Sequence, residues 1–434
     1  MKRIVQIPRR MYNESMTQVI TNKEHKKIYS KFRDDLVYWA SSKTEPKTGN
    51  HDIQYFLELQ QERWKDHHIS CKYTFAPEGH IYRASKISNS IPYKDRIKKY
   101  NQYIYHQQIN RTISYYQNGQ ELDSKKEFVG LYETFIDVNT KDKEIEFECP
   151  NCGGLSPLHV LEEDGCPFCG TKYDLEELHT KVTNFFYLQD GSFSDQQWFG
   201  YKKWILTISL ALTVFFMLFH LHHSIFVLIL MFFFSFLFFL ALVLLAGFIL
   251  YIRQIHQATD EFTQLMEECK GTKKQVSLKL AQYDPSFTYE YFESKAMALA
   301  RIVLFHNDPD HCLQYEGSRI GDAFFDILDV KYKGGFILNS VRLRQNVVHV
   351  NLTLLVTTTT MKDSNIIDQD ERITLEMIHN IHFPVDASHS IIKMQCEHCG
   401  GSFDARKSNT CPYCGSSYDL ESTDWKLIKI YRNE

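Results

Sequence analysis

The chain has 434 residues and a formal net charge of −4, from 49 Lys and Arg against 53 Asp and Glu. The length allows two or three domains, and the charge balance lacks the basic excess that is usual in nucleic-acid-binding proteins. No Asp, Glu, Lys or Arg occurs from Trp204 to Ile252, which argues against a soluble single-domain protein.

Residues 1–200 predict an N-terminal α+β domain. The segments Asn22–Lys43 and Asp52–His67 favour helices, because apolar side chains recur at helical spacing. A hairpin turn is expected at residues 76–79, where Pro and Gly occur together. The segment Tyr100–Tyr116 is compatible with a strand or a helix. The sequence leaves open whether this half is a diverged copy of the C-terminal half.

Basic residues in and near this last segment are compatible with a nucleic-acid contact. Lys98, Lys99 and Arg111 lie among tyrosines. Because the chain has no net basic excess, we interpret these three side chains as a solvated surface.

Eight cysteines form four CxxC pairs and predict two zinc ribbons, at residues 149–169 and 396–414. A tetrahedral zinc ion takes four ligands, and two CxxC turns supply four thiolates with no open position for water. We therefore expect two structural zinc ions and no catalytic metal. The predicted ligands are Cys149, Cys152, Cys166 and Cys169 in the first ribbon, and Cys396, Cys399, Cys411 and Cys414 in the second.

The two ribbons are copies of one another. Residues 166–176 and 411–421 are identical at eight of eleven positions. A predicted strand precedes each ribbon (Phe128–Val138 and Arg372–Ile381), and another follows it (Lys181–Tyr187 and Trp425–Tyr431). The shared unit is thus two strands joined by a zinc-stapled excursion.

The uncharged segment between the two copies, residues 204–252, predicts a transmembrane hairpin. Its spans are Trp204–Leu221 and Ile225–Ile252, and about 20 apolar residues suffice to cross a bilayer. Lys202, Lys203 and Arg253 flank the hairpin and place both termini in the cytosol by the positive-inside rule. The predicted location is the cell membrane, as a two-span, multi-pass protein.

A helical stalk (253–282) and a C-terminal domain (283–434) follow. The helix Thr288–His306 precedes long strands, of which Val348–Val356 alternates apolar and polar residues. Helices followed by antiparallel strands predict a cone-like α+β layer, with helices on one face of a curved sheet. The predicted fold class is therefore α+β, with two cytosolic domains that each carry a four-cysteine zinc ribbon and are joined by the membrane hairpin.

The C-terminal segment resembles the Tim-forty-four-like domain, the C-terminal domain of the mitochondrial import-motor tether. The resemblance covers about Tyr283–Tyr431 and is carried by Asp284-Pro285-x-Phe287, the helices after it, the Val348–Val356 strand and Trp425-Lys426-Leu427. It implies a nuclear-transport-factor-two-like cone and a membrane-associated scaffold that docks other proteins without catalysis. The chain departs from this family by two inserted TFIIB-like zinc ribbons and an upstream membrane hairpin.

The combined prediction is a membrane-anchored, non-enzymatic scaffold or tether. Its expected partners are the lipid bilayer and unidentified proteins, with no nucleic acid. Two alternatives remain: a cone that binds or converts a small molecule, and a zinc-ribbon regulator that binds nucleic acid. The best local cluster for catalysis is His306, Asp308, Asp310 and His311, but Asp-Pro-Asp at a helix start is usually a cap. The oligomeric state is not predicted.

Overall fold

The computed structural model divides the chain into two compact units, residues 1–9 with 191–268 and residues 10–190 with 269–434. It describes residues 18–42, 46–93, 96–138, 146–148, 154–157, 160, 166–170, 180–189, 195–218, 227, 229, 231–247, 267–284, 287–307, 312, 314–362, 365–382, 393–395, 398, 402–404, 410–417 and 425–433. We call the unit of residues 10–190 and 269–434 the sheet unit and the other the helical unit.

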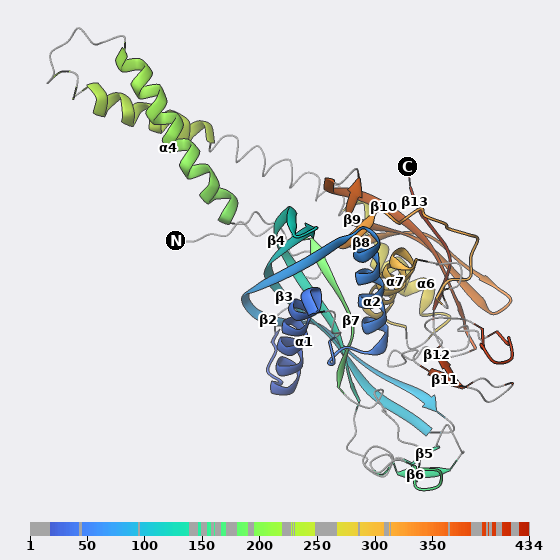
Figure 1. Cartoon of the computed structure of the whole chain (residues 1–434). Helices are drawn as coiled ribbons and strands as arrows, with labels where there is room; N and C mark the ends of the chain where they lie inside the picture. Colours follow the sequence, from blue (N-terminus) through green and yellow to red (C-terminus); the bar gives the residue numbers. More distant parts are fainter. Residues whose placement is uncertain are drawn as a thin grey trace. The chain divides into compact units, whose positions relative to one another are not determined.

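In each half of the sheet unit, two helices precede a run of long strands (Figure 1). Its first half contains β1 (Gln18–Val19), α1 (Lys23–Ser42), α2 (His51–Asp66), β2 (Ile69–Tyr93), β3 (Arg96–Gln117), β4 (Gln120–Val138), β5 (Glu146–Glu148), β6 (Leu155–Pro157) and β7 (Lys181–Gln189). Its second half contains α6 (Thr272–Leu280), α7 (Tyr289–Phe305), β8 (Ile327–Arg344), β9 (Val347–Lys362), β10 (Asn365–Asn380), β11 (Lys393–Gln395), β12 (Ser402–Asp404) and β13 (Lys426–Arg432).

A single nine-stranded sheet runs through both halves, in the order β1-β2-β3-β4-β7-β8-β9-β10-β13. Neighbouring strands are antiparallel except β7 and β8, which run parallel and pair at Leu188 and Tyr332. The predicted α+β class holds, but the predicted architecture of two separate domains is wrong, because this β7–β8 contact joins the two halves into one mixed sheet.

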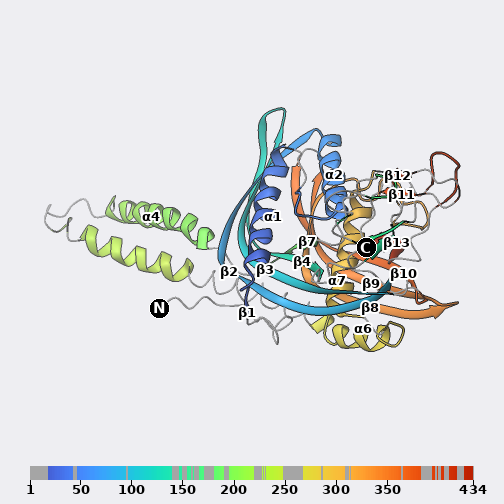
Figure 2. The ribbon, with the colours of Figure 1, turned by 90° about the horizontal axis from the view of Figure 1, so that it is seen from below.

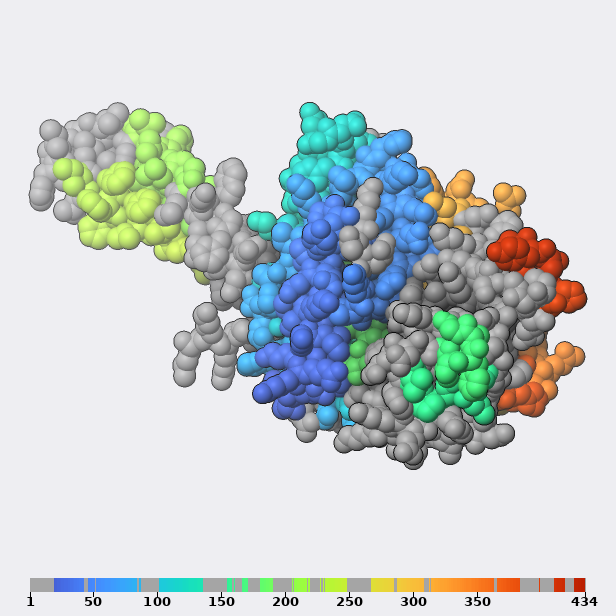
Figure 3. Space-filling view, turned by 60° about the horizontal axis from the view of Figure 1, so that its bottom comes forward, coloured from blue at the N-terminus to red at the C-terminus, as the bar shows by residue number. Residues whose placement is uncertain are grey.

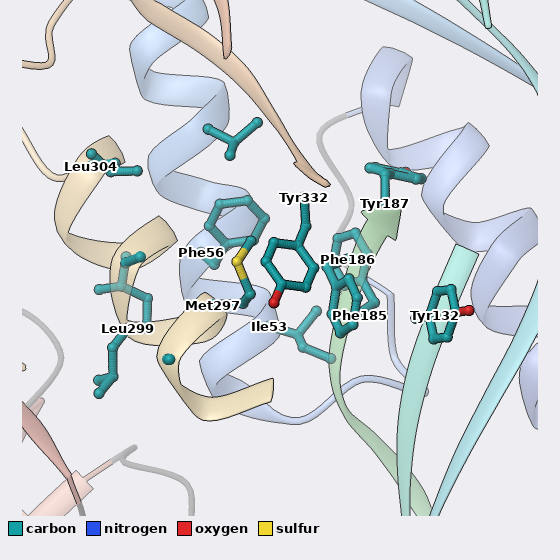
Figure 4. Close-up of a cluster of buried hydrophobic side chains, with 14 of the residues drawn as sticks. Ile53, Phe56, Tyr132, Phe185, Phe186, Tyr187, Met297, Leu299, Leu304 and Tyr332 are labelled. Atoms are coloured by element: carbon teal, nitrogen blue, oxygen red, sulfur yellow. The ribbon is translucent and has the colours of Figure 1, made fainter. Parts of the chain in front are cut away.

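The core lies where the halves meet. Helices α2 and α7 pack on one another and on β7, the middle strand of the sheet (Figure 2). Figure 4 shows side chains from both halves in one cluster, among them Phe56 of α2, Met297 of α7, Phe185 of β7 and Tyr332 of β8. Burying one such side chain contributes about 1.5–3 kcal/mol to the free energy of unfolding. The two halves therefore stabilise each other.

The two halves repeat one arrangement. In each, a three-stranded meander leads to a two-stranded hairpin, and a return strand then pairs antiparallel with the third meander strand: β4 with β7, and β10 with β13. In each half, the return strand also forms a pair of backbone hydrogen bonds with a segment that follows a helix. Val182 bonds to Thr48 and Asn50 (3.1 and 2.9 Å), and Leu427 bonds to Gln314 and Glu316 (2.9 and 2.8 Å). The repeat therefore extends from the ribbons to the meander, the small hairpin and the return strand of each half.

Most of the predicted helices and strands are confirmed. The helices expected at Asn22–Lys43, Asp52–His67 and Thr288–His306 are α1, α2 and α7, and the open segment Tyr100–Tyr116 is strand β3. The hairpin turn at residues 76–79 is wrong. Strand β2 continues through it and stays paired with β3 on both sides of a bulge, which takes up Gly79 at a φ of 65°.

The helical unit corrects the predicted membrane hairpin. Helix α4 spans Asp195–Leu218, and residues 231–247 are also helical. Within the described residues, no helix is long and apolar enough to cross a membrane. The predicted spans, Trp204–Leu221 and Ile225–Ile252, and the multi-pass cell-membrane location are therefore wrong. The prediction counted one unbroken apolar run, whereas the first turns of α4 are polar and only parts of the second span are described.

Candidate functional site

The described parts of the two zinc ribbons have matching backbones. Strands β5 and β6 form a hairpin around residues 149–154, and β11 and β12 form one around residues 396–401. Each of these loops carries the first CxxC pair of its ribbon. In the second pairs, the N–H of Gly170 donates to the carbonyl of Cys166 and that of Gly415 to the carbonyl of Cys411, both at 2.8 Å. The two turns are thus the same knuckle.

The knuckles also share their exposure. Cys166 and Cys411 are buried, Cys169 and Cys414 are exposed, and Phe168 and Tyr413 are 68% and 70% exposed at the turn tips. In Figure 3 the described parts of the first ribbon (green) and of the second (red) lie at the surface. Gly170 and Gly415 have φ of 69° and 73°, a conformation that glycine adopts without strain.

The remaining predicted ligands, Cys149, Cys152, Cys396 and Cys399, lie outside the described residues. Among those that are described, no group of three or more His, Cys, Asp or Glu side chains could hold a metal ion. The assembled four-cysteine sites of the predicted fold are therefore not found there, because only two of the four ligands of each ribbon are described. The two that are described fit a zinc knuckle in backbone and spacing.

A buried ionic network joins the two halves of the sheet. Arg111 of β3 lies 2.7 Å from Glu127 of β4 and 2.9 Å from Asp329 of β8. Lys331 of β8 pairs with the same Glu127 and lies 3.2 Å from Asp368 of β10. Each of these cations thus contacts carboxylates of two strands. The network therefore holds together the strands of the two halves.

The shifted pKa values favour the charged forms of Arg111, Glu127 and Asp368. Burial lowers the pKa of Arg111, but Asp329 and Glu127 raise it by more, and the net pKa lies well above the usual value. Burial raises the pKa of Asp368, but Lys331 and Lys125 lower it by more, to about 2. These three groups stay charged near neutral pH and have no proton to exchange there, so we assign the network a structural role. The prediction that Arg111 belongs to a solvated surface is wrong, because its side chain is fully buried.

Glu133 of β4 is a second buried carboxyl, with a different environment. It is fully buried, and neither oxygen has a hydrogen-bond partner among the described residues. Burial raises its pKa well above the usual value, and the nearby Arg33 lowers it by less. The folded chain therefore favours the neutral acid at this position.

A cavity of about 40 Å³ lies beside the helices of the core. Residues from both halves line it: Asn50, Asp52, Ile53 and Phe56 around the start of α2; Gln102, Thr134, Thr183 and Asn184 on β3, β4 and β7; Tyr291, Ser294, Lys295, Ala298, Leu299, Arg301 and Ile302 on α7; and Gln314 and Trp425. No sequence pattern indicated it, because its walls come from segments far apart in the chain.

Other residues singled out in the sequence contribute no site. Asp308, Asp310 and His311 lie outside the described residues, so the cluster with His306 is not tested. Cys71, Cys269 and Cys312, which pair with no CxxC motif, are buried as expected for small core residues.

Comparison with known proteins adds no relative. No family model matches the chain, and no curated protein or solved structure matches it significantly. The resemblance to the Tim-forty-four-like domain therefore stays a prediction.

Proposed function

We propose that this chain is a non-enzymatic scaffold that attaches to a lipid surface through its helical unit and docks protein partners with its duplicated sheet unit. The single observation that carries this proposal is an inverted polarity in the helical unit. Two of its hydroxyl side chains, Ser209 and Thr213, are buried, whereas 15 of its large apolar side chains are exposed.

The exposed side chains are concentrated in one segment. Of the 25 exposed large hydrophobic residues among the described ones, 15 lie between Ile208 and Leu245. They include neighbouring pairs such as Phe233 with Phe234 and Leu237 with Phe238, so exposure is not confined to one stripe. A helix that is apolar on all sides needs an apolar environment around it, and a lipid phase provides one where a single protein partner covers only one side.

The buried hydroxyls complete this pattern. Ser209 and Thr213 are fully buried and donate to carbonyls four residues earlier, Ile205 at 2.7 Å and Ser209 at 2.8 Å. Such bonds satisfy a hydroxyl inside its own helix, so these residues need no water. An ordinary surface helix would place the same hydroxyls outside and the leucines inside.

Zinc completes the proposed scaffold as a structural element. The cysteine spacing and the matching knuckles support one zinc ion in each ribbon, held by four thiolates. The metal would then tie the two loops of each ribbon together between the third meander strand and the return strand. The acidic residues of the second ribbon, among them Glu397, Asp404 and Asp419, disfavour the nucleic-acid alternative.

Lipid attachment can be tested by flotation of the full chain with phosphatidylcholine–phosphatidylglycerol vesicles. The test variant replaces Leu210, Leu237 and Leu245 of the helical unit by Ser. The control variant replaces Leu155, Leu278 and Leu343, which are exposed elsewhere to a similar degree, by Ser.

We expect the wild type and the control to float with the vesicles. The test variant should bind at least about tenfold more weakly, since each leucine removed from an apolar phase loses more than about 1 kcal/mol. Equal flotation of both variants, or no flotation of the wild type, would refute lipid attachment.

A further inference from the structure

Arg301, on α7, is a buried cation beside the core cavity. Its side chain is 4% exposed, and its guanidinium carbon lies 4.1 Å from the ring centre of Phe56 and 4.6 Å from that of Phe185. The rings cover its faces and leave its N–H edge for polar contacts. Burial lowers the pKa of Arg301 to about 10, and Tyr187 and Asp329 raise it by less, so the residue remains charged at neutral pH.

This cation lacks a counter-ion within the described part of the chain. Its one hydrogen bond there runs from Nη2 to Oδ1 of Asn184, at 3.0 Å. Among the described residues its buried Nε has no hydrogen-bond partner and no ion pair joins its guanidinium to a carboxylate; Asp329, which raises its pKa, pairs with Arg111 instead. A buried arginine whose Nε–H has no partner is costly unless an anion pairs with it.

The cavity walls supply a second cation and several polar side chains. Lys295 lines the cavity together with the first turn of α2, where the N–H of Ile53 already donates to Oδ1 of Asn50 (3.0 Å), so that the helix dipole alone favours an anion there. Asp52 is the one acidic lining residue. Gln102 also lines the cavity, is 1% exposed, and its Oε1 has no partner among the described residues. An acceptor in that position calls for a ligand with a hydrogen to donate.

We propose that this cavity binds a small oxyanion that also carries a hydroxyl group. The anionic oxygens pair with the Arg301 guanidinium, and the hydroxyl donates to Gln102. The volume of about 40 Å³ admits a ligand of only a few non-hydrogen atoms, such as hydrogen phosphate or a two-carbon hydroxycarboxylate. Because both halves line the cavity, the ligand would strengthen their junction.

The test is calorimetric titration and thermal unfolding of the full chain with four probes. Hydrogen phosphate and glycolate carry the hydroxyl, and sulfate and acetate lack it. We expect one of the first two to bind and to raise the melting temperature, and its hydroxyl-free counterpart to bind at least about tenfold more weakly. Which of the two binds identifies the source of the oxyanion as inorganic or organic.

The variants are Arg301→Met, which removes the charge, and Gln102→Glu, which places a carboxylate beside the ligand. Both should abolish binding. The control is Arg63→Met. Arg63 is also buried and packs against a phenylalanine ring, at 5.0 Å from Phe325, but it donates to the carbonyls of Phe324 and Leu304 (2.6 and 3.2 Å) and does not line the cavity. Its loss should lower stability and leave the probe affinity unchanged.

Three results would overturn the proposal: binding of none of the four probes, equal binding of all four, or unchanged binding by the Arg301 and Gln102 variants. In case Arg301→Met does not fold, Lys295→Met provides a milder test, because Lys295 is only partly buried and its loss should weaken binding about tenfold or less. None of these measurements involves lipid, so failure here leaves the proposed attachment intact, and failure of flotation leaves the cavity intact.

Discussion

Gly79 and Gly334 lie in equivalent bulges of the two halves of the sheet. Residues 79–81 of β2 face a single residue of β3, and residues 333–335 of β8 face a single residue of β9. In each bulge the glycine has a positive φ, 65° in one and 85° in the other. Bulges are retained within a family when its sequences diverge. Two equivalent bulges therefore support a duplicated ancestor more strongly than strand order alone.

The two glycines differ in their surroundings, which predicts unequal effects of the same substitution. Gly79→Ala meets no atom within 4 Å, whereas the Cβ of Gly334→Ala would lie 3.0 Å from Cδ1 of Leu188. The left-handed conformation costs about 1–2 kcal/mol in both variants. Gly334→Ala should lose more free energy of unfolding in urea titrations, because Leu188 must also shift at the β7–β8 junction. Equal losses of unfolding free energy in the two variants would show that the Leu188 side chain moves away at no cost.

Local patterns predicted the elements but not how the halves combine. The helix expected at Asn22–Lys43 differs from α1 by one residue at each end, because periodicity and polar flanks are local signals. Strands β7 and β8 pair at one position, Leu188 with Tyr332. No sequence pattern in either strand predicts this pairing. The strand-ribbon-strand unit could be predicted as the helices could, because cysteine spacing, like helical periodicity, is a local signal in the sequence.

The candidate sites show the same limit. The sequence around Arg111 predicts a solvated side chain, because its buried partner Asp329 lies 218 residues away. The shifted pKa values of Arg301 and Glu133 likewise result from burial by distant segments. By contrast, the inverted polarity of the helical unit could be suspected from its composition, since residues 204–252 lack any Asp, Glu, Lys or Arg.

Loss of Arg111 should weaken the junction strongly. Arg111→Met removes one charge from the buried network and leaves Glu127 and Asp329 without their shared partner. Breaking a buried ion pair in this way costs about 3–5 kcal/mol, which chemical unfolding can measure. The control is Lys273→Met, at an exposed pair with Glu290 (2.8 Å), where about 0–1 kcal/mol is expected. Similar losses in the two variants would mean that the network does not clamp the halves.

Zinc binding predicts a stoichiometry that falls by one ion for each ribbon that is disrupted. The wild-type chain should carry about two zinc ions by elemental analysis, and Cys166→Ser and Cys411→Ser about one each. Hydrogen exchange should then rise locally, around β7 in the first variant and β13 in the second. Cys312→Ser, at a buried cysteine outside both ribbons, should keep both ions. Full zinc content in either ribbon variant would refute the assignment.

Glu133 should make stability fall as pH rises. Its pKa is raised in the folded chain, so between the unfolded value, about 4.5, and the folded value the folded state holds one proton more than the unfolded state. The free energy of unfolding therefore decreases with pH across that window. Glu133→Gln keeps the shape of the neutral acid and removes the titration. The variant should be more stable than the wild type at pH 7, and the difference should vanish near pH 4. Melting curves of both proteins from pH 4 to 8 measure this directly, and parallel curves across that range would show that Glu133 does not titrate differently in the folded and unfolded states.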